Sequence, residues 1–219
     1  MKEINNTNPL MAIDIYKAGH MRFYKPGTTS IYSGMVPRSN KKYDRAVFVG
    51  LQPKLKVLAQ PITFEHGQEF FEYWEEILDT KPPQDVVEKI NAIVELGYFP
   101  ICIKAVAEGT IIDTGNVVVT VKETIPGFHW CVGLLESFLL KVWSPTSVAT
   151  LSNKYFELAS KYTEETSDSG FLLPFLVHDF GYRGASSEQT AEEAGAANLM
   201  VGWYGTDTVP AVKFLKNTR

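Results

Sequence analysis

The sequence predicts an α/β protein in which an α+β N-terminal region leads into parallel strands separated by helices. Two observations carry this prediction. Amphipathic helical repeats and β-branched runs follow each other irregularly through residue 145, whereas a strand, helix, strand, helix order begins at residue 171. Strands separated by helices pair in parallel through right-handed crossovers. We therefore predict two domains, an α+β domain over residues 1–145 and the beginning of an α/β layer over residues 146–219.

Composition excludes several classes of protein. The chain has 219 residues, of which 45% are hydrophobic, and a net charge of −4. Such a chain buries a large core, so it is not disordered. The negative charge provides no basic field for nucleic acid. The most apolar segment, VGLLESFLLKVW, is interrupted by Glu136 and Lys141, and the N-terminus lacks the apolar stretch of a signal peptide. We expect a cytoplasmic protein without membrane partners.

Cysteines and histidines give no sign of a disulfide framework or a metal centre. Cys102 lies in a strand-like run and Cys131 in a helix-like run, and we expect both to be small apolar core residues. None of the four histidines has a second His or Cys at metal-ligand spacing. GxGxxG, GxxxxGK[ST], GxSxG and HExxH motifs are absent from the sequence. We therefore predict no metal-ligating residues.

The N-terminal region begins with a turn and a strand. Lys25-Pro26-Gly27 combines a fixed dihedral with a permissive one, which is typical of a turn. SIYSGMV, residues 30–36, is strand-like, and residues 46–59 predict a strand or loop followed by a helix. Pro53 fits only the first turn of that helix, because proline has no amide hydrogen to donate.

Two amphipathic helices follow. From Thr63 onward apolar residues recur at three- and four-residue spacing, which predicts a helix that ends near Lys81-Pro82-Pro83. A second apolar stripe predicts a helix from Asp85 to Gly97. The stripe residues are Phe70, Phe71, Trp74, Ile77, Leu78, Val86, Ile90, Ile93 and Val94.

The middle of the chain predicts strands and then helices. Residues 101–109 and 115–122 are rich in β-branched residues and joined by turn residues, which predicts a hairpin or a small β-domain. Residues 128–143 and 147–163 predict helices that are interrupted at Ser144-Pro145. Residues 163–170 predict a loop.

The last part of the chain predicts two strand–helix pairs. Residues 171–184 predict a buried strand that ends in a glycine-flanked turn, and residues 186–200 a helix with capping-box spacing between Ser186 and Gln189. A second strand ends at GTDT, residues 205–208, and a helix begins near Pro210.

Candidate ligand-binding residues lie at these two strand ends, because ligands of parallel α/β sheets bind at the carboxyl ends of the strands. From the residues alone, Asp207 either binds a ligand or caps the following helix. Arg183 is a ligand contact or an exposed turn residue, and Phe180 is a ligand contact or a core anchor. His178 follows an apolar run and predicts a buried, hydrogen-bonded histidine.

The sequence resembles the nicotinamide phosphoribosyltransferase family at six places in the expected order, from about residue 9 to about residue 215. These places are MAIDIYKAGHMRFYKPGTTSIYS, VFVGLQ, KAVAEGTIIDTGNVVVTV, WSPTSVATLS, HDFGYRGASSEQTA and GTDTV. The resemblance implies that the α+β region leads into the first strands of an incomplete type II phosphoribosyltransferase α/β barrel. It also implies that the chain is an N-terminal portion: a truncated product, a fragment, or one piece of a split enzyme.

The resemblance implies a pentosyltransferase of NAD biosynthesis, which transfers a phosphoribosyl group from phosphoribosyl pyrophosphate to nicotinamide. Two alternatives remain open. One is a nicotinate phosphoribosyltransferase-like enzyme, against which the acid of GTDT argues. The other is a non-catalytic dimerisation or assembly module of a split enzyme.

Four residues are assigned to the base by the resemblance. Phe180 is expected to stack on one face of the pyridine ring, and Tyr16 from the other subunit of a head-to-tail homodimer on the opposite face. Asp207 is expected to accept a hydrogen bond from the carboxamide and to repel a nicotinate carboxylate. Asp14 is expected to shape the shared pocket across the dimer.

The resemblance assigns the pyrophosphate end to two basic residues. Arg183 is expected to contact pyrophosphate, and Arg38 lies in a looser match to a basic residue of the family. Mg²⁺ is expected to accompany phosphoribosyl pyrophosphate, and coupling to ATP is expected only in the complete enzyme. The family's later residues are absent from this sequence, so we expect the isolated chain to be inactive and to need a complementary C-terminal half.

Overall fold

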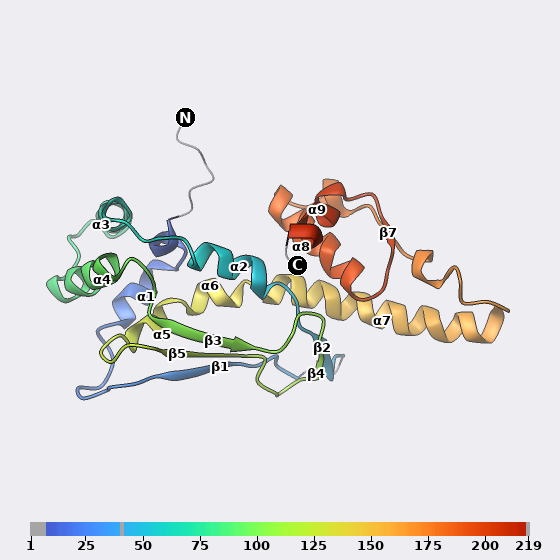
Figure 1. Ribbon diagram of the computed structural model, residues 1–219, viewed down its shortest axis with the longest axis horizontal. Helices are drawn as coiled ribbons and strands as arrows, with labels where there is room; N and C mark the ends of the chain where they lie inside the picture. Colours follow the sequence, from blue (N-terminus) through green and yellow to red (C-terminus); the bar gives the residue numbers. More distant parts are fainter. Residues whose placement is uncertain (1–7, 40–41, 218–219) are drawn as a thin grey trace. The chain divides into compact units, whose positions relative to one another are not determined.

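The chain groups into two compact units whose segments alternate along the sequence (Figure 1). The structure is a computed structural model that describes residues 8–39 and 42–217. The first unit consists of residues 1–35, 53–105 and 119–141, and the second of residues 36–52, 106–118 and 142–219. Residues 36–52 and 106–118 therefore group with the later part of the chain. The predicted domain limits at 145 and 146 stay a prediction.

The first unit contains a three-stranded antiparallel sheet. Its strands are β1 (Tyr32–Met35), β5 (Val119–Glu123) and β3 (Ile101–Ala105), in the order β1-β5-β3. Val119 and Val121 are buried, whereas Lys122 is exposed, as the pleat of a half-covered sheet requires. The strands predicted from 101–109 and 115–122 are thus antiparallel neighbours, but the strand predicted near residue 30 pairs on the other side of β5.

Helices α3 (Phe64–Leu78) and α4 (Gln84–Leu96) form where the apolar stripes predict them. They pack against each other (Figure 1). Gly97 ends α4 with φ at 74°, a left-handed conformation that glycine adopts without steric cost. The buried stripe residues are Phe70, Trp74, Val86, Ile90 and Ile93.

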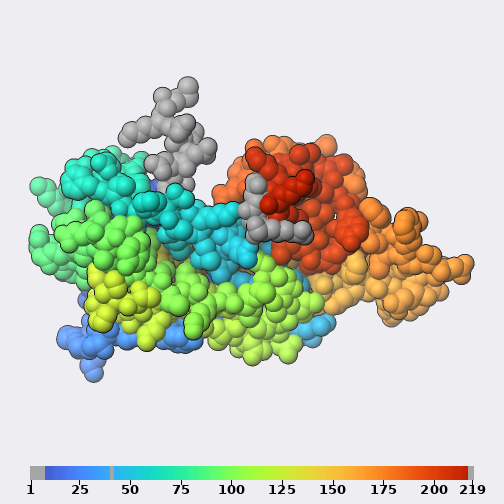
Figure 2. Space-filling view, viewed as in Figure 1, coloured from blue at the N-terminus to red at the C-terminus, as the bar shows by residue number. Residues whose placement is uncertain are grey.

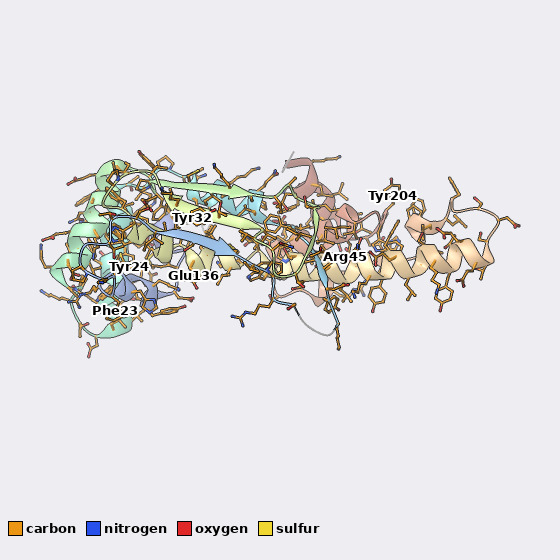
Figure 3. All side chains as sticks on the ribbon, turned by 90° about the horizontal axis from the view of Figure 1, so that it is seen from below. Phe23, Tyr24, Tyr32, Arg45, Glu136 and Tyr204 are labelled. Carbon is orange, nitrogen blue, oxygen red and sulfur yellow. The ribbon has the colours of Figure 1, made fainter. Side chains whose placement is uncertain are left out.

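An ion pair joins two of the remaining helices of the first unit. The remaining elements are η1 (Pro9–Met11), α1 (Ile15–His20), α5 (Trp130–Leu134) and α6 (Glu136–Leu140), while α2 (Leu51–Leu58) contributes residues to both units. Lys17 Nζ lies 2.6 Å from Glu136 Oε2. Burial alone lowers the pKa of Lys17, but the hydrogen bond and charge of Glu136 outweigh it and raise this pKa above its usual value. Figure 3 shows Glu136 in this region, beside Tyr24.

The second unit is built on a long helix and a short antiparallel strand pair. Strands β2 (Arg45–Val47) and β4 (Ile111–Asp113) pair antiparallel, and α7 (Trp143–Thr166) packs on β2. The predicted interruption at Ser144-Pro145 is wrong, because Pro145 occupies the first turn of α7, where no amide hydrogen is needed. The predicted helix over 128–143 is instead divided between α5 and α6. The second unit's core contains Val47, Val49, Ala149 and Ala197.

Two parallel strands and two helices form the C-terminal layer of this unit. Strands β6 (His178–Asp179) and β7 (Gly205–Thr206) are parallel, as predicted, and are each followed by a helix, α8 (Glu188–Met200) and α9 (Val209–Asn217). The cap of α8 is Ser187, one residue beyond the predicted one, and its hydroxyl accepts from Thr190 N–H.

Helices α8 and α9 approach closely at Gly195. A Cβ atom at this position would lie 2.7 Å from the Cβ of Ala211 on α9 and 2.9 Å from Oδ2 of Asp179 on β6. Real Cβ atoms do not come so close to other atoms. The missing side chain of Gly195 is therefore what allows α8 to lie against both neighbours.

The buried strand predicted from residue 171 is wrong except at its end. Residues 173–175 form a short 3₁₀ helix, η2 (Leu173–Phe175), with Pro174 in its only turn. Figure 2 shows this orange segment on the surface. The segment packs against α7, and the Phe175 ring contacts that of Tyr204, yet five of its apolar side chains remain exposed. They are Phe171, Leu172, Phe175, Leu176 and Val177.

One of the two cysteine predictions is also wrong. Cys131 is buried, and its burial raises the pKa of the thiol, whereas Cys102 is exposed because it lies on the uncovered face of the sheet. Over residues 8–39 and 42–217, none of the helices combines the length and apolar character required to cross a membrane.

Candidate functional site

A pocket of about 460 Å³ opens at the carboxyl ends of β6 and β7. Residues that follow each strand line it, because parallel strands end at the same edge of a sheet. The turn after β6 contributes an aromatic ring and a guanidinium, and the segment after β7 contributes a carboxylate and the first turn of α9. The lining residues are Phe180, Tyr182, Arg183, Glu188, Asp207, Thr208, Val209 and Pro210.

Asp179 joins the two strand ends through its carboxylate. Its Oδ1 accepts a hydrogen bond from Gly181 N–H at 2.7 Å, and its Oδ2 accepts one from the Thr206 hydroxyl at 2.9 Å. The Thr206 hydroxyl in turn accepts from Thr208 N–H at 3.0 Å. The Asp179 carbonyl accepts from Asp207 N–H at 2.9 Å. One residue therefore holds the backbone on both sides of the pocket.

His178 and Asp207 are in direct contact. Nε2 of His178 lies 3.0 Å from Oδ1 of Asp207. The side chains are 39% and 63% exposed, so the pair is open to solvent. The imidazole also lies beside Phe180, with ring centroids 4.7 Å apart and planes tilted by 37°. The rings of His178 and Phe180 and the carboxylate of Asp207 thus lie next to one another.

Arg183 supplies a positive charge to the pocket. It lies in the 3₁₀ turn η3 (Gly181–Gly184) and is exposed. Among the residues that the structure describes, its guanidinium has no ion-pair partner, so it is available to an anion. Thr208 is 1% exposed, and its hydroxyl lacks a hydrogen-bond partner within the same described residues.

The structure resolves several alternatives that the sequence leaves open. Phe180 is 60% exposed, so it is not a core anchor. The Asp207 carboxylate pairs with His178 rather than with an amide of α9, so it is not a helix cap. His178 forms the predicted hydrogen bond but is exposed, as are the residues that directly precede it.

The other predicted site residues lie outside this pocket lining. Asp14 and Tyr16 belong to the first unit, at the start of α1, and both are exposed. Tyr16 is 53% exposed, and its ring edge contacts His20 with centroids 5.0 Å apart. Arg38 belongs to the second unit and is exposed. The structure therefore brings together Phe180, Arg183 and Asp207 and does not add Arg38 to them.

Sequence reasoning missed Asp179 and the partnership of His178. The sequence does contain a signal for Asp179. It stands at the end of the predicted strand, directly before Phe180, where a carboxylate can accept hydrogen bonds from backbone amides of the turn. The contact of His178 with Asp207 depends on the register of β6 and β7, which pairs His178 with Gly205. The sequence does not determine this register by itself.

Comparison with known proteins identifies relatives over almost the whole chain. Residues 8–84 match the family described as nicotinamide phosphoribosyltransferase, N-terminal domain. The chain is 36% identical to the nicotinamide phosphoribosyltransferase of Xanthomonas campestris pv. campestris (strain 8004), over 94% of this chain and 43% of that protein. It is 32% identical to that of Acinetobacter baylyi (strain ATCC 33305 / BD413 / ADP1), over 94% of this chain and 44% of the relative.

A solved structure shares the fold. The crystal structure of human nicotinic acid phosphoribosyltransferase superposes with a TM-score of 0.65 over 92% of this chain and 37% of that chain, at 17% identity. The fold is therefore the α/β fold of a phosphoribosyltransferase, as predicted. The matches in sequence go further: the chain is similar to nicotinamide phosphoribosyltransferases over 94% of its length, and residues 8–84 match the N-terminal domain of that family. It spans less than half the length of these two bacterial relatives.

Proposed function

We propose that this chain supplies the base-recognition part of a nicotinamide phosphoribosyltransferase. The reaction joins nicotinamide to phosphoribosyl pyrophosphate and gives nicotinamide mononucleotide and pyrophosphate. The observation that carries the proposal is the gathering of Phe180, Arg183 and Asp207 on one pocket. An aromatic face, a cation and a carboxylate are the groups that a pyridine carboxamide and a pyrophosphate require.

The chemistry needs positioning more than proton transfer. The lone pair of the pyridine nitrogen forms a bond to C1′ of the ribose, while the bond from C1′ to the pyrophosphate oxygen breaks and its electron pair leaves with pyrophosphate. The ring becomes a cation as the new bond forms. Phe180 stabilises that ring by stacking, which contributes about 1–3 kcal/mol by analogy with nucleic-acid bases. A neutral pyridine nitrogen carries no proton to remove, so no general base is required.

Asp207 provides the selectivity for an amide. A carboxylate only accepts hydrogen bonds, so it pairs with the NH₂ of nicotinamide and repels the carboxylate of nicotinate. Its exposed fraction of 63% leaves this carboxylate accessible from the pocket.

Arg183 provides the contact to pyrophosphate, because a planar guanidinium holds two oxygens at once. Mg²⁺ is not assigned to the protein. Among the described residues, no group of three or more His, Cys, Asp or Glu side chains could hold a metal ion. We propose that Mg²⁺ enters the site bound to phosphoribosyl pyrophosphate. Coupling to ATP remains a proposal for the complete enzyme.

The proposal extends to a homodimer in which Tyr16 and Asp14 of one subunit complete the pocket of the other. Support comes from the exposure of both side chains, which leaves them accessible to a partner. Arg38, also exposed, is proposed as a second cation for pyrophosphate. A cytoplasmic location is part of the same proposal.

The experiment measures base selectivity in the complete enzyme that contains this chain. Asp207→Asn should reduce the ratio of kcat/KM for nicotinamide to kcat/KM for nicotinate by tenfold or more, about 1.4 kcal/mol per tenfold. Asp168→Asn is the matched control, since this acid is exposed in the loop after α7 and does not line the pocket. An unchanged ratio in the Asp207 variant removes the carboxylate from this role and favours the nicotinate-specific alternative.

A second candidate function is a non-catalytic assembly module, which the exposed apolar segment of residues 171–177 favours. We expect the 219-residue chain alone to form no nicotinamide mononucleotide, because it spans less than half of its bacterial relatives. Product formed by the isolated chain from nicotinamide, phosphoribosyl pyrophosphate and Mg²⁺ would refute this. Purification with a second polypeptide that supplies the remaining length supports a split enzyme, whereas a stable dimer without affinity for either substrate supports the assembly module.

A further inference from the structure

We propose that His178 is a positioning residue that fixes the Asp207 carboxylate for amide recognition, and that Gly205 exists to make room for its imidazole. This inference rests on the proposed function. It assigns a role to a histidine that contacts the recognition carboxylate without itself lining the pocket. It also assigns a role to a glycine one strand away.

The contact between His178 and Asp207 has a defined direction. A carboxylate has no hydrogen to donate, so Nε2 of His178 carries the hydrogen and donates it to Oδ1 at 3.0 Å. The imidazole is then a neutral ring with its hydrogen on Nε2 or a cation with hydrogens on both nitrogens. In both cases Oδ1 is occupied, and Oδ2 is the oxygen left for the carboxamide.

The imidazole of His178 lies against Gly205 on the neighbouring strand. In the parallel register His178 is the partner of Gly205, and Asp207 follows two residues later on the same chain. A Cβ atom at Gly205 would lie 2.5 Å from Nδ1 of His178, closer than real Cβ atoms approach other atoms. The ring therefore passes through the space that a side chain at Gly205 would fill. A Cβ there would also lie 3.0 Å from the carbonyl oxygen of Val177, but its closest contact is the imidazole, so a larger residue should displace the ring from Asp207.

The backbone of Asp207 is held independently. Its N–H donates to the carbonyl of Asp179 at 2.9 Å, so the position of the Cα atom does not depend on His178. What the backbone does not fix is rotation of a carboxylate whose side chain is 63% exposed. His178 removes that freedom, and preorganised acceptors bind a ligand more tightly than rotating ones.

Exposure separates this role from a role in folding. Ion pairs and hydrogen bonds between exposed groups contribute little to stability, because water competes for them. His178 is 39% exposed at its side chain, so replacing it should leave the fold intact and change only recognition.

The test uses two substitutions of His178 that differ in reach. His178→Gln places an amide N–H close to the position of Nε2, whereas His178→Asn places one near Nδ1, too short to reach Asp207. In the complete enzyme we expect His178→Asn to raise KM for nicotinamide about tenfold with kcat little changed, and His178→Gln to restore most of that loss. KM for nicotinate should change less than threefold in both variants.

Gly205→Ala tests the same contact without altering either partner. Gly170→Ala is its control, because a Cβ there meets nothing within 4 Å. We expect Gly205→Ala to match His178→Asn in KM and Gly170→Ala to match the wild type. Equal losses in the Gln and Asn variants, a change in kcat rather than KM, or a normal KM in Gly205→Ala each overturns the proposal.

A readout independent of activity distinguishes this proposal from the proposed function. Nitrogen-15 NMR of the 219-residue chain reports which ring nitrogen of His178 carries hydrogen and whether Asp207→Asn shifts it. A hydrogen on Nε2 that responds to Asp207→Asn supports the contact, and a ring insensitive to that substitution overturns it. Failure of the wild-type complete enzyme to use nicotinamide refutes the proposed function, and with it the amide role, even where the NMR contact is present.

Discussion

Two regions of the molecule are rich in large apolar residues, yet they are held together in different ways. In the helical pair α3 and α4, Phe70 and Trp74 are 1% and 5% exposed. In residues 171–177, Phe171 is 79% exposed. The strand ends that follow this segment are joined instead by the hydrogen bonds of the Asp179 carboxylate.

The comparison teaches that apolar composition predicts burial only where the chain supplies a second layer. The stripe of α3 meets α4, which begins at Gln84 shortly after α3 ends at Leu78, and both stripes recur at about 3.6 residues per turn. Residues 171–177 touch α7 and, through Phe175, the ring of Tyr204, but these contacts leave most of their apolar side chains exposed. At the strand ends that follow, hydrogen bonds of the Asp179 carboxylate position the backbone around the pocket.

The largest expected effect separates the two regions directly. Phe70→Ala should lower the free energy of unfolding by about 3–5 kcal/mol, because it removes a buried aromatic ring. Phe171→Ala should change it by less than about 0.5 kcal/mol. Urea titration followed by circular dichroism measures both. Similar decreases in the free energy of unfolding of the two variants would contradict this distinction, since they would mean that Phe171 is buried in solution.

A smaller effect is expected from Asp179. Asp179→Ala removes the acceptor of both Gly181 N–H and the Thr206 hydroxyl, and should cost about 1–3 kcal/mol. Asp179→Asn retains one carbonyl oxygen and should cost less. Hydrogen exchange at the amides of Gly181 and Thr208 is the sharper measurement, because the loss should be local. Unaltered exchange in Asp179→Ala would show that packing, not hydrogen bonding, holds the strand ends.

The ion pair between the buried Lys17 and the half-exposed Glu136 gives a pH-dependent effect. The pKa of Lys17 is raised above its usual value, so the pair stabilises the folded chain fully below about pH 10.4, the unfolded pKa. This stabilisation disappears as the pH rises through the higher folded pKa. Glu136→Gln should cost up to about 1 kcal/mol at pH 8, because Glu136 is half exposed, and nothing well above pH 11. Urea titrations of both proteins from pH 7 upward measure the difference, and a constant difference contradicts it.

The smallest expected effect on stability belongs to the exposed segment. Replacing Phe171 and Phe175 together by serine should leave the unfolding midpoint unchanged but reduce self-association, because exposed apolar side chains favour contact between molecules. Sedimentation velocity across a range of concentrations measures it. If the double substitution leaves self-association unaffected, the surface that mediates self-association lies in another part of the chain.

Helices with a clear apolar period could be predicted from the sequence, whereas short strands and their register could not. The apolar spacing of Phe70 and Trp74 is compatible only with a helix whose apolar face points toward the core. FLLPFLV has no period, and a strand requires neighbours that lie elsewhere in the chain. Pro145 shows a third case, since a proline that ends one helix also fits the first turn of another.

The candidate site was predictable in its residues but not in its contacts. Phe180, Arg183 and Asp207 stand out by motif, because each follows a strand end in a conspicuous run of glycine and polar residues. The link between His178 and Asp207 depends on a parallel register of two residue pairs. Such short pairings are decided by tertiary packing, which no local pattern reports.

The close approach at Gly195 has a consequence for how tolerant the protein is to mutation. Residue 195 lies on the helix that covers the two strands, and it has no place in the pocket lining. An alanine there would push α8 away from the Asp179 carboxylate that joins the two strand ends, so the rim of the pocket would widen although every residue on it was intact. Substitutions at Gly195 should therefore disturb the pocket as readily as substitutions of the aromatic and acidic residues that line it.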